Sequence, residues 1–393
     1  MAFGDFTVDR NSTKYVLGSG GTIVPVATDE PAIEFNTDGS FKGLLVEPAA
    51  TNLCLRSENI TTTWVPINAT RTANATTALD GNTTADKLGD NGATGTGNVT
   101  VFQTITVSSS TKYTASVFLK ADQLAFARLE AYQYDGANTG EQYFGLSGDG
   151  SLGTASNLDD STITKYPDGW YRCSITFTTG ANTTFPFAIY LANSISSTIV
   201  NLDGTSSIFV WGAQVEASPI ATSYIPTTTA SVTRNKDDIT LTGASDLIGQ
   251  SEGTLYIEVD WRLTAGTSQG LLQASDGTGN NLIAIYNLSS SVELRMYAQA
   301  NGGSFEVNQG VDSSGFSGIQ KIAFAYKTDD FELYRNGSSI SSSTSGSLAA
   351  LATLTDIDLG QNFLAGSQAN MHIRAVQIIP RRLSDEQLIE LTS

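Results

Sequence analysis

Apolar and polar residues alternate in short runs along most of this chain. Two clear runs are 99–107, Val-Thr-Val-Phe-Gln-Thr-Ile-Thr-Val, and 113–119, Tyr-Thr-Ala-Ser-Val-Phe-Leu. Strict alternation is typical of half-buried β-strands, because successive side chains point to opposite faces of a sheet. Turn pairs such as Asp135-Gly136 and Asp203-Gly204 separate the runs. The pattern therefore predicts an all-β protein.

The strand-like runs form two series, joined by a segment rich in Thr and Ser at 226–231. Regularly spaced strands with turn signals favour sandwiches or jelly rolls. We therefore predict two jelly-roll or β-sandwich domains, 43–234 and 235–393. Strand signals are weaker in residues 1–42, which we interpret as an extended N-terminal arm. Because arms that lack their own core often order on a partner, this arm is a candidate attachment segment.

One short helix is predicted at the C-terminal end. Ser384-Asp-Glu-Gln387 fits a capping box, and Leu388, Ile389 and Leu391 would form the apolar face.

The composition and charge of the chain restrict the kinds of partner that it is expected to bind. Charged residues make up 15% of the chain, and the net charge is −18. Nucleic acid and anionic membranes are disfavoured as partners, since phosphates require neutralisation by Lys and Arg. We expect no membrane insertion, because no apolar run approaches about 18 residues, and no secretory signal. An acidic surface suits neutral partners such as glycans.

The first domain resembles a module of bacteriophage head-fibre, spike and tail-fibre proteins. The segments that carry this resemblance are Gly43-Leu-Leu-Val-Glu-Pro-Ala-Ala-Thr-Asn-Leu53, Asp168-Gly-Trp-Tyr-Arg172 and Trp211-Gly-Ala-Gln-Val-Glu216. The resemblance implies a jelly roll of the carbohydrate-binding-module type.

The second domain resembles concanavalin A-like, laminin-G-type lectin sandwiches, through Lys321-Ile-Ala-Phe-Ala-Tyr326 and Phe331-Glu-Leu-Tyr-Arg-Asn-Gly337. Together the two resemblances imply a virion structural protein, assembled in the host cytoplasm. They imply a fibre, spike or decoration subunit, a homotrimer attached to other virion proteins, that binds host-surface glycans during adsorption. The alternatives are a purely structural head, neck or tail component and, less favoured, a polysaccharide depolymerase.

A catalytic centre is not predicted. Glucanases with the concanavalin A-like fold carry Glu-x-Asp-x-x-Glu on one strand; here Glu258 and Asp260 match, but Leu263 replaces the last acid. The single histidine, His372, lies in a predicted strand without a nucleophile motif, and we expect it to be exposed. We therefore predict that the protein is not an enzyme.

Two turns rich in Asp and Gly, 147–150 and 276–279, could hold Ca²⁺ through oxygen ligands. Ordinary turn chemistry explains the same residues, so no cofactor is predicted.

Two predicted strands present aromatic and charged side chains on one face. Rings can stack on sugars, and charged groups can bond sugar hydroxyls. A solvated face, or a face against another subunit, would show the same alternation. The candidate carbohydrate-binding residues are Arg128, Glu130, Tyr132 and Tyr134 in the first domain, and Glu293, Arg295 and Tyr297 in the second.

Overall fold

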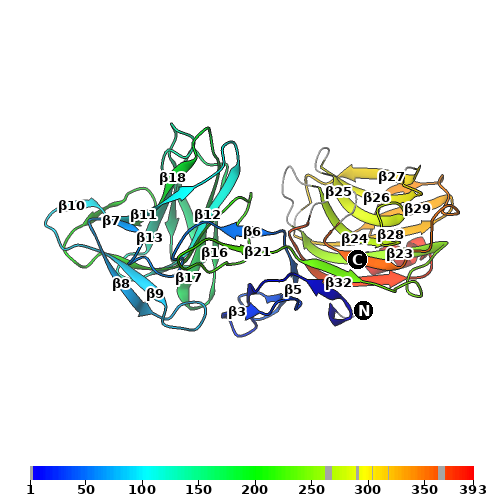
Figure 1. Cartoon of the computed structure of the whole chain (residues 1–393), viewed down its shortest axis with the longest axis horizontal. Helices are drawn as coiled ribbons and strands as arrows, with labels where there is room; N and C mark the ends of the chain where they lie inside the picture. The colour runs from blue at the N-terminus through cyan, green and yellow to red at the C-terminus, as the bar shows by residue number, and fades with distance from the viewer. Residues whose placement is uncertain (1–2, 262–267, 289–291, 303, 317, 362–367) are drawn as a thin grey trace.

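The chain folds into two antiparallel β-sandwiches that lie side by side, with β6, β21 and the N-terminal strands between them (Figure 1). The computed structural model describes residues 3–261, 268–288, 292–302, 304–316, 318–361 and 368–393. The predicted all-β class, with one short C-terminal helix, is confirmed. Among these residues, no helix has the length and apolar character needed to cross a bilayer.

The first sandwich packs two six-stranded sheets face to face. The side chains on one side of each strand form its core, for example Val117 and Ile175 from one sheet and Leu129 and Ile189 from the other. One sheet has the order β15 (Ser151–Ser156), β14 (Gly140–Gly145), β13 (Phe126–Ala131), β18 (Thr184–Ala192), β11 (Thr100–Thr106) and β7 (Val65–Ile67). The other has the order β16 (Asp160–Lys165), β17 (Trp170–Thr178), β12 (Lys112–Ala121), β20 (Ser207–Glu216), β9 (Ala85–Asp90) and β8 (Ala69–Thr76).

The second sandwich packs two seven-stranded sheets around a core that includes Ile257, Ile285 and Phe324. One sheet has the order β1 (Thr7–Asp9), β22 (Asp238–Leu241), β31 (Asp356–Leu359), β24 (Gln269–Ser275), β25 (Leu282–Leu288), β26 (Glu293–Ala300) and β27 (Ser304–Asp312). The other has the order β30 (Ser338–Ser343), β29 (Asp330–Arg335), β28 (Ile319–Lys327), β23 (Glu252–Trp261), β32 (Met371–Ile379), β5 (Phe41–Val46) and β4 (Ile33–Phe35).

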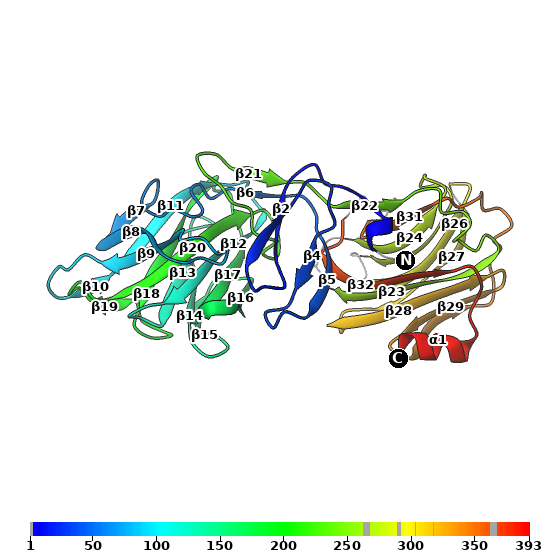
Figure 2. The same cartoon turned by 90° about the horizontal axis from the view of Figure 1, so that it is seen from below.

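Three two-stranded ribbons and short helices complete the fold. The ribbons are β2–β3 (Lys14–Leu17, Ile23–Val26), β21–β6 (Val232–Arg234, Ala50–Asn52) and β10–β19 (Thr96–Asn98, Ile199–Asn201). Short 3₁₀ turns occupy Phe3–Asp5 and Pro167–Gly169. The C-terminal helix α1 (Asp385–Thr392) lies against β28 and β29 (Figure 2). Its capping box at Ser384 and Gln387 is confirmed, and Leu388 is buried, but Ile389 is exposed.

The N-terminal segment is not an arm without a core, and residues 43–46 do not belong to the first sandwich. Strand β1 pairs with β22, β4 pairs with β5, and β5 pairs with β32, so all three belong to the second sandwich. Leu44 and Val46 enter its core. Gly43 permits the close approach of β5, because a Cβ there would lie 2.9 Å from the Cβ of His372. The segment therefore orders on this chain's own sheets.

A buried network of five charged side chains holds the junction together. We call Arg10, Lys14, Glu47, Arg234 and Asp237 the junction network. The Lys14 ammonium lies 2.6 Å from Asp237 and 3.1 Å from Glu47, Arg10 lies 3.1 Å from Asp237, and Arg234 lies 3.6 Å from Glu47. None of these side chains is more than 3% exposed. The network therefore ties the N-terminal strands to the segment that joins the two sandwiches.

Candidate functional site

The first candidate site lies on the outer face of the β15–β7 sheet, where two cross-strand rows run side by side. The register places Arg128 opposite both Tyr143 and Tyr190, and Glu130 opposite Glu141. We call Arg128, Glu130, Glu141, Tyr143 and Tyr190 the Arg128 face. Further along the same two rows, on β11 and β7, the side chains of Val65, Ile67 and Phe102 form an apolar surface.

Charge and aromatic contacts hold the Arg128 face rigid. Arg128 donates to Glu141 at 2.7 Å and also pairs with Glu130. Its guanidinium carbon lies 4.0 Å from the centre of the Tyr190 ring and 5.6 Å from that of Tyr143. The Tyr190 hydroxyl donates to Glu130 at 3.1 Å. Burial, and then the charge of Glu130, raise the pKa of Tyr190 to about 12, so this hydroxyl stays protonated at neutral pH.

The structure brings together only part of the predicted set in the first domain. Arg128 and Glu130 share one face, but Glu130 is only 7% exposed, which corrects its predicted exposure. Tyr132 is 46% exposed just beyond the end of β13. Tyr134, in contrast, is buried; its ring lies 4.8 Å from that of Phe177. The strand ends at Ala131, and Gln133 adopts a positive φ of 45°, which breaks the alternation. Tyr134 is therefore corrected to a core residue.

Sequence reasoning missed Glu141, Tyr143 and Tyr190. They stand on β14 and β18, and only the pairing of these strands with β13 brings them to Arg128. The alternation within each strand indicates which side chains share a face. Which strands become neighbours, and in which register, is not visible in that signal.

The second candidate set lies on the outer face of the β1–β27 sheet. Arg295 pairs with Glu293 and donates to Asn308 at 2.7 Å, so the two charged residues share one face, while their binding of a sugar stays a prediction. Tyr297 is only 2% exposed, which corrects its predicted exposure. Its ring packs edge to face on Tyr286 at 5.5 Å, in a small apolar cluster on this face. Tyr297 is therefore not open to stack on a ligand in this structure.

Two of the residues considered for catalysis, Glu258 and His372, are engaged in structural contacts. Glu258 accepts a hydrogen bond from Arg374 at 2.9 Å. Leu263, which replaces the third acid of the glucanase motif, lies outside the described residues. His372 is 3% exposed and contacts Glu34, so its predicted exposure is wrong. The reason is that β5 covers β32 on one side and carries β4, with Glu34, alongside.

The two Asp- and Gly-rich turns have the contacts of ordinary turns. Asp276 accepts hydrogen bonds from the backbone and hydroxyl of Thr278 and from Asn281. The Asp149 side chain is 98% exposed and pairs with Lys165. Within the described ranges, no three His, Cys, Asp or Glu side chains gather closely enough to hold a metal ion.

Comparison with known proteins yields similarity to solved structures alone. No family model matches the chain, and no curated protein matches it. The carbohydrate-binding module CBM40 of Ruminococcus gnavus IT-sialidase, bound to α2,3-sialyllactose, is 17% identical over 38% of this chain and 86% of that one, with a TM-score of 0.33. Leech intramolecular trans-sialidase is 17% identical over 37% and 23%, with a TM-score of 0.31.

The binding domain of botulinum neurotoxin DC, in complex with rat synaptotagmin II, is 15% identical over 40% of each chain, with a TM-score of 0.33. Identities and TM-scores this low establish neither a shared family nor a shared ligand.

Proposed function

We propose that this protein is a non-catalytic binding subunit that recognises a neutral, hydroxyl-rich glycan through the Arg128 face. The observation that carries the proposal is the cross-strand juxtaposition of Tyr143 and Tyr190 with Arg128, which is itself held by Glu130 and Glu141. Charged groups on a rigid sheet can bond sugar hydroxyls. The partly exposed Phe102 and the exposed Val65 offer an apolar surface for the C–H face of a sugar ring.

The charge of the Arg128 face favours neutral over acidic sugars. One guanidinium faces two carboxylates, so the face carries an excess of negative charge at neutral pH. An acidic sugar would bring a further carboxylate toward Glu130 and Glu141, and like charges in a partly buried site repel. A neutral hexose meets no such penalty.

The proposed setting is a bacteriophage particle, in which the protein would be a fibre, spike or decoration subunit. This part rests on the resemblance of 43–53, 168–172, 211–216 and the second-domain segments to virion modules. The proposed trimer and the attachment to other virion proteins rest on the same resemblance. Mass measurement in solution tests the trimer, and a strict monomer at high concentration would exclude it.

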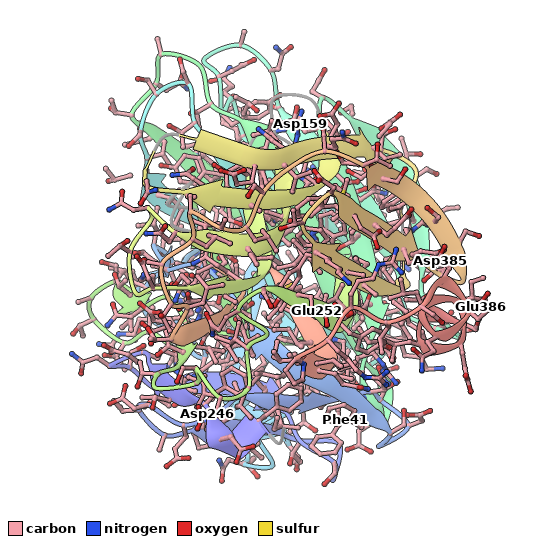
Figure 3. All side chains as sticks on the ribbon, turned by 90° about the vertical axis from the view of Figure 1, so that its right-hand side faces the viewer. Phe41, Asp159, Asp246, Glu252, Asp385 and Glu386 are labelled. Atoms are coloured by element: carbon pink, nitrogen blue, oxygen red, sulfur yellow. The ribbon has the colours of Figure 1, made fainter. Side chains whose placement is uncertain are left out.

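A glycan array tests the binding site. The wild-type protein should bind a set of neutral glycans, and Tyr190→Ala should weaken binding at least about fivefold, or ~1 kcal/mol, because the ring and its bond to Glu130 are lost. Tyr190→Phe keeps the ring and should retain most of the binding. Phe41→Ala is the matched control: Phe41 is 38% exposed and lies on the second sandwich (Figure 3).

An array without hits for the wild-type protein, together with tight attachment to virion proteins, would favour the purely structural alternative. Release of reducing ends from a polysaccharide would instead favour the depolymerase.

A further inference from the structure

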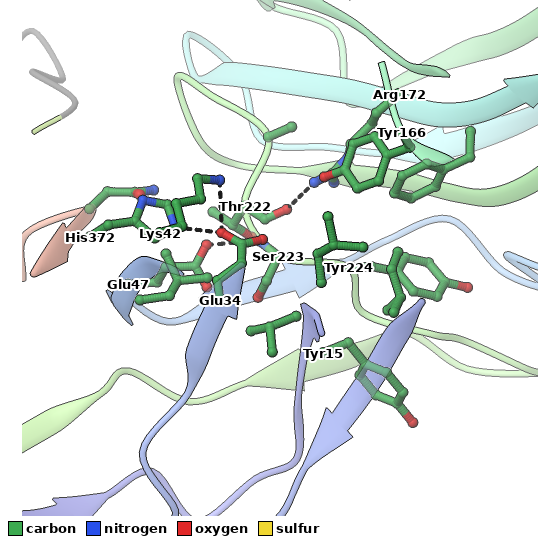
Figure 4. A pocket seen from close by; sticks show the side chains of 17 residues that line it. Tyr15, Glu34, Lys42, Glu47, Tyr166, Arg172, Thr222, Ser223, Tyr224 and His372 are labelled. Carbon is green, nitrogen blue, oxygen red and sulfur yellow. Dashed lines mark hydrogen bonds and ion pairs between the residues drawn. The ribbon is translucent and has the colours of Figure 1, made fainter. Parts of the chain in front are cut away.

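A polar cleft lies between the two sandwiches, apart from the Arg128 face (Figure 4). Its walls come from N-terminal strands (Tyr15, Glu34, Lys42), from the first sandwich (Tyr166, Arg172) and from β32 (His372). A groove that shares Lys42, Tyr166 and Arg172 with the cleft continues it along β16 and β17. The junction network, which includes the lining residue Glu47, fixes these walls, so the cleft is preformed, as small-molecule sites usually are.

The cations and carboxylates that line this cleft are balanced, in contrast to the rest of the chain. Lys42 and His372 both contact the carboxylate of Glu34, and Arg172 adds a second cation. The nearby carboxylate of Glu216 accepts hydrogen bonds from the backbone and hydroxyl of Thr222. Among the lining residues, Lys42 and Arg172 stand against Glu34 and Glu47, whereas the whole chain has 21 Lys and Arg against 39 Asp and Glu. The cleft therefore repels an anionic group less than the rest of the chain does.

One lining residue, Arg172, holds a buried polar atom that has no hydrogen-bond partner within the described part of the chain. Arg172 donates from its terminal nitrogens to the carbonyl of Thr222 at 2.7 Å and to Ser116 at 3.1 Å, but its Nε has no acceptor. A buried donor without a partner costs about 1–3 kcal/mol. A ligand oxygen placed against this nitrogen would satisfy it.

The remaining lining suits a hydroxylated ring. The partly exposed rings of Tyr15 and Tyr166 line the cleft and offer flat apolar surface. Along the groove, side-chain hydroxyls form a cross-strand ladder in which Thr162 and Ser174 lie 2.6 Å apart, with Thr164 and Thr176 on the same stretch. Such a ladder can exchange hydrogen bonds with sugar hydroxyls.

We propose that this cleft is a second binding site, which takes a carboxylated sugar of the uronic acid type. The carboxylate would lie near Lys42 and Arg172, where charge-assisted hydrogen bonds are strongest. The sugar ring would contact Tyr166, and its hydroxyls would face the ladder of Thr and Ser hydroxyls on β16 and β17. A free sugar acid and an acidic unit within a glycan share this chemistry. The proposal does not depend on the Arg128 face, where one guanidinium faces two carboxylates.

Isothermal titration of the full chain tests this site, with glucuronate, glucose and a hyaluronan oligosaccharide as probes. Glucuronate should bind and glucose should not. If the oligosaccharide binds more tightly than glucuronate, the ligand is an acidic unit within a glycan. If the two bind equally well, the ligand is a free sugar acid. Lys42→Met and Arg172→Met should each weaken glucuronate binding about tenfold or more, the effect of losing one charged hydrogen bond. Lys87→Met is the matched control, because Lys87 pairs with Asp122 outside the cleft.

Ala221→Phe separates loss of the site from loss of the fold. Ala221 lines both the cleft and the groove, so the larger side chain should block binding without removing a charge. Tyr190→Ala should leave glucuronate binding unchanged, which distinguishes failure here from failure of the Arg128 face. Three results would overturn the proposal: no glucuronate binding by the wild-type protein, equal binding of glucose, or binding unaffected by Lys42→Met, Arg172→Met and Ala221→Phe together.

Discussion

Replacement of Lys14 by Met should destabilise the protein more than any exchange of an exposed lysine. The Lys14 side chain is fully buried, and its ammonium contacts Asp237, Glu47 and the carbonyl of Leu45. Met fills a similar volume but supplies no charge. In this variant Asp237 would still pair with Arg10, and Glu47 would still pair with the more distant Arg234. Two buried carboxylates would then share two guanidinium groups.

The expected loss is about 3–5 kcal/mol, the usual cost of removing one partner from a buried ion pair. Burial opposes ionisation of Glu47, yet Arg234 and Lys14 lower the pKa of this carboxyl well below its ordinary value, as expected if it depends on these cations. Urea unfolding followed by circular dichroism measures the loss. Lys165→Met is the control: Lys165 is 49% exposed and pairs with the exposed Asp149, so its removal should have little effect.

A double variant tests the cause of the loss. Because the cost comes from unpaired buried charge, Lys14→Met combined with Asp237→Asn should be less destabilised than the sum of the two single variants. If Lys14→Met lies within about 1 kcal/mol of the wild type, the junction network is not the structural clamp inferred here.

Three further predictions concern single side chains. Burial raises the pKa of Asp358 from 3.8 to about 6, so the stability that this carboxyl contributes is full below pH 3.8 and is lost as the pH rises through 6. Asp358→Asn should therefore raise the free energy of unfolding by about 3 kcal/mol at pH 7.5 and leave it unchanged at pH 3.5, as measured by calorimetry. Burial opposes ionisation of Glu34, but His372 and Lys42 outweigh burial and lower the pKa of this carboxyl from 4.5 to about 2. The ionised Glu34 therefore stabilises the protein above pH 4.5, and this stabilisation is lost as the pH falls to 2. In urea unfolding, the free energy of unfolding should fall by about 3 kcal/mol less between pH 4.5 and pH 2 in Glu34→Gln than in the wild type. Tyr134→Ala should cost about 3–5 kcal/mol because it empties part of the core, whereas Tyr132→Ala should change stability by less than about 0.5 kcal/mol; equal effects would contradict the assigned burial.

The strands were predictable because alternation is a local signal. The runs at 99–107 and 113–119 correspond to β11 and β12, and the capping box marks the start of α1. Each of these features depends on neighbouring residues alone. Long-range pairing leaves no such signal: Leu44 in β5 finds its partner Ile373 at the far end of the chain. The assignment of β1, β4 and β5 to the second sandwich therefore required the structure.

The candidate sites, too, could be predicted from the sequence only where their residues lie on one strand. Arg128 and Glu130 were readable from one strand, but Tyr190 joins them only through the register of β18 against β13. Tyr134 was misassigned because the alternation was extended past Ala131, where Gln133 turns the backbone. The junction network and the cleft combine segments from both ends of the chain, so no single run of residues indicates them.

A crystal structure of the full chain with the strongest neutral glycan from the array tests the central claim most directly. The account predicts a sugar ring against the Arg128 face, in contact with Tyr190 and the apolar Phe102, with a hydroxyl bonded to Glu130. A glycan seated anywhere else on the molecule, with the Arg128 face empty, would contradict it.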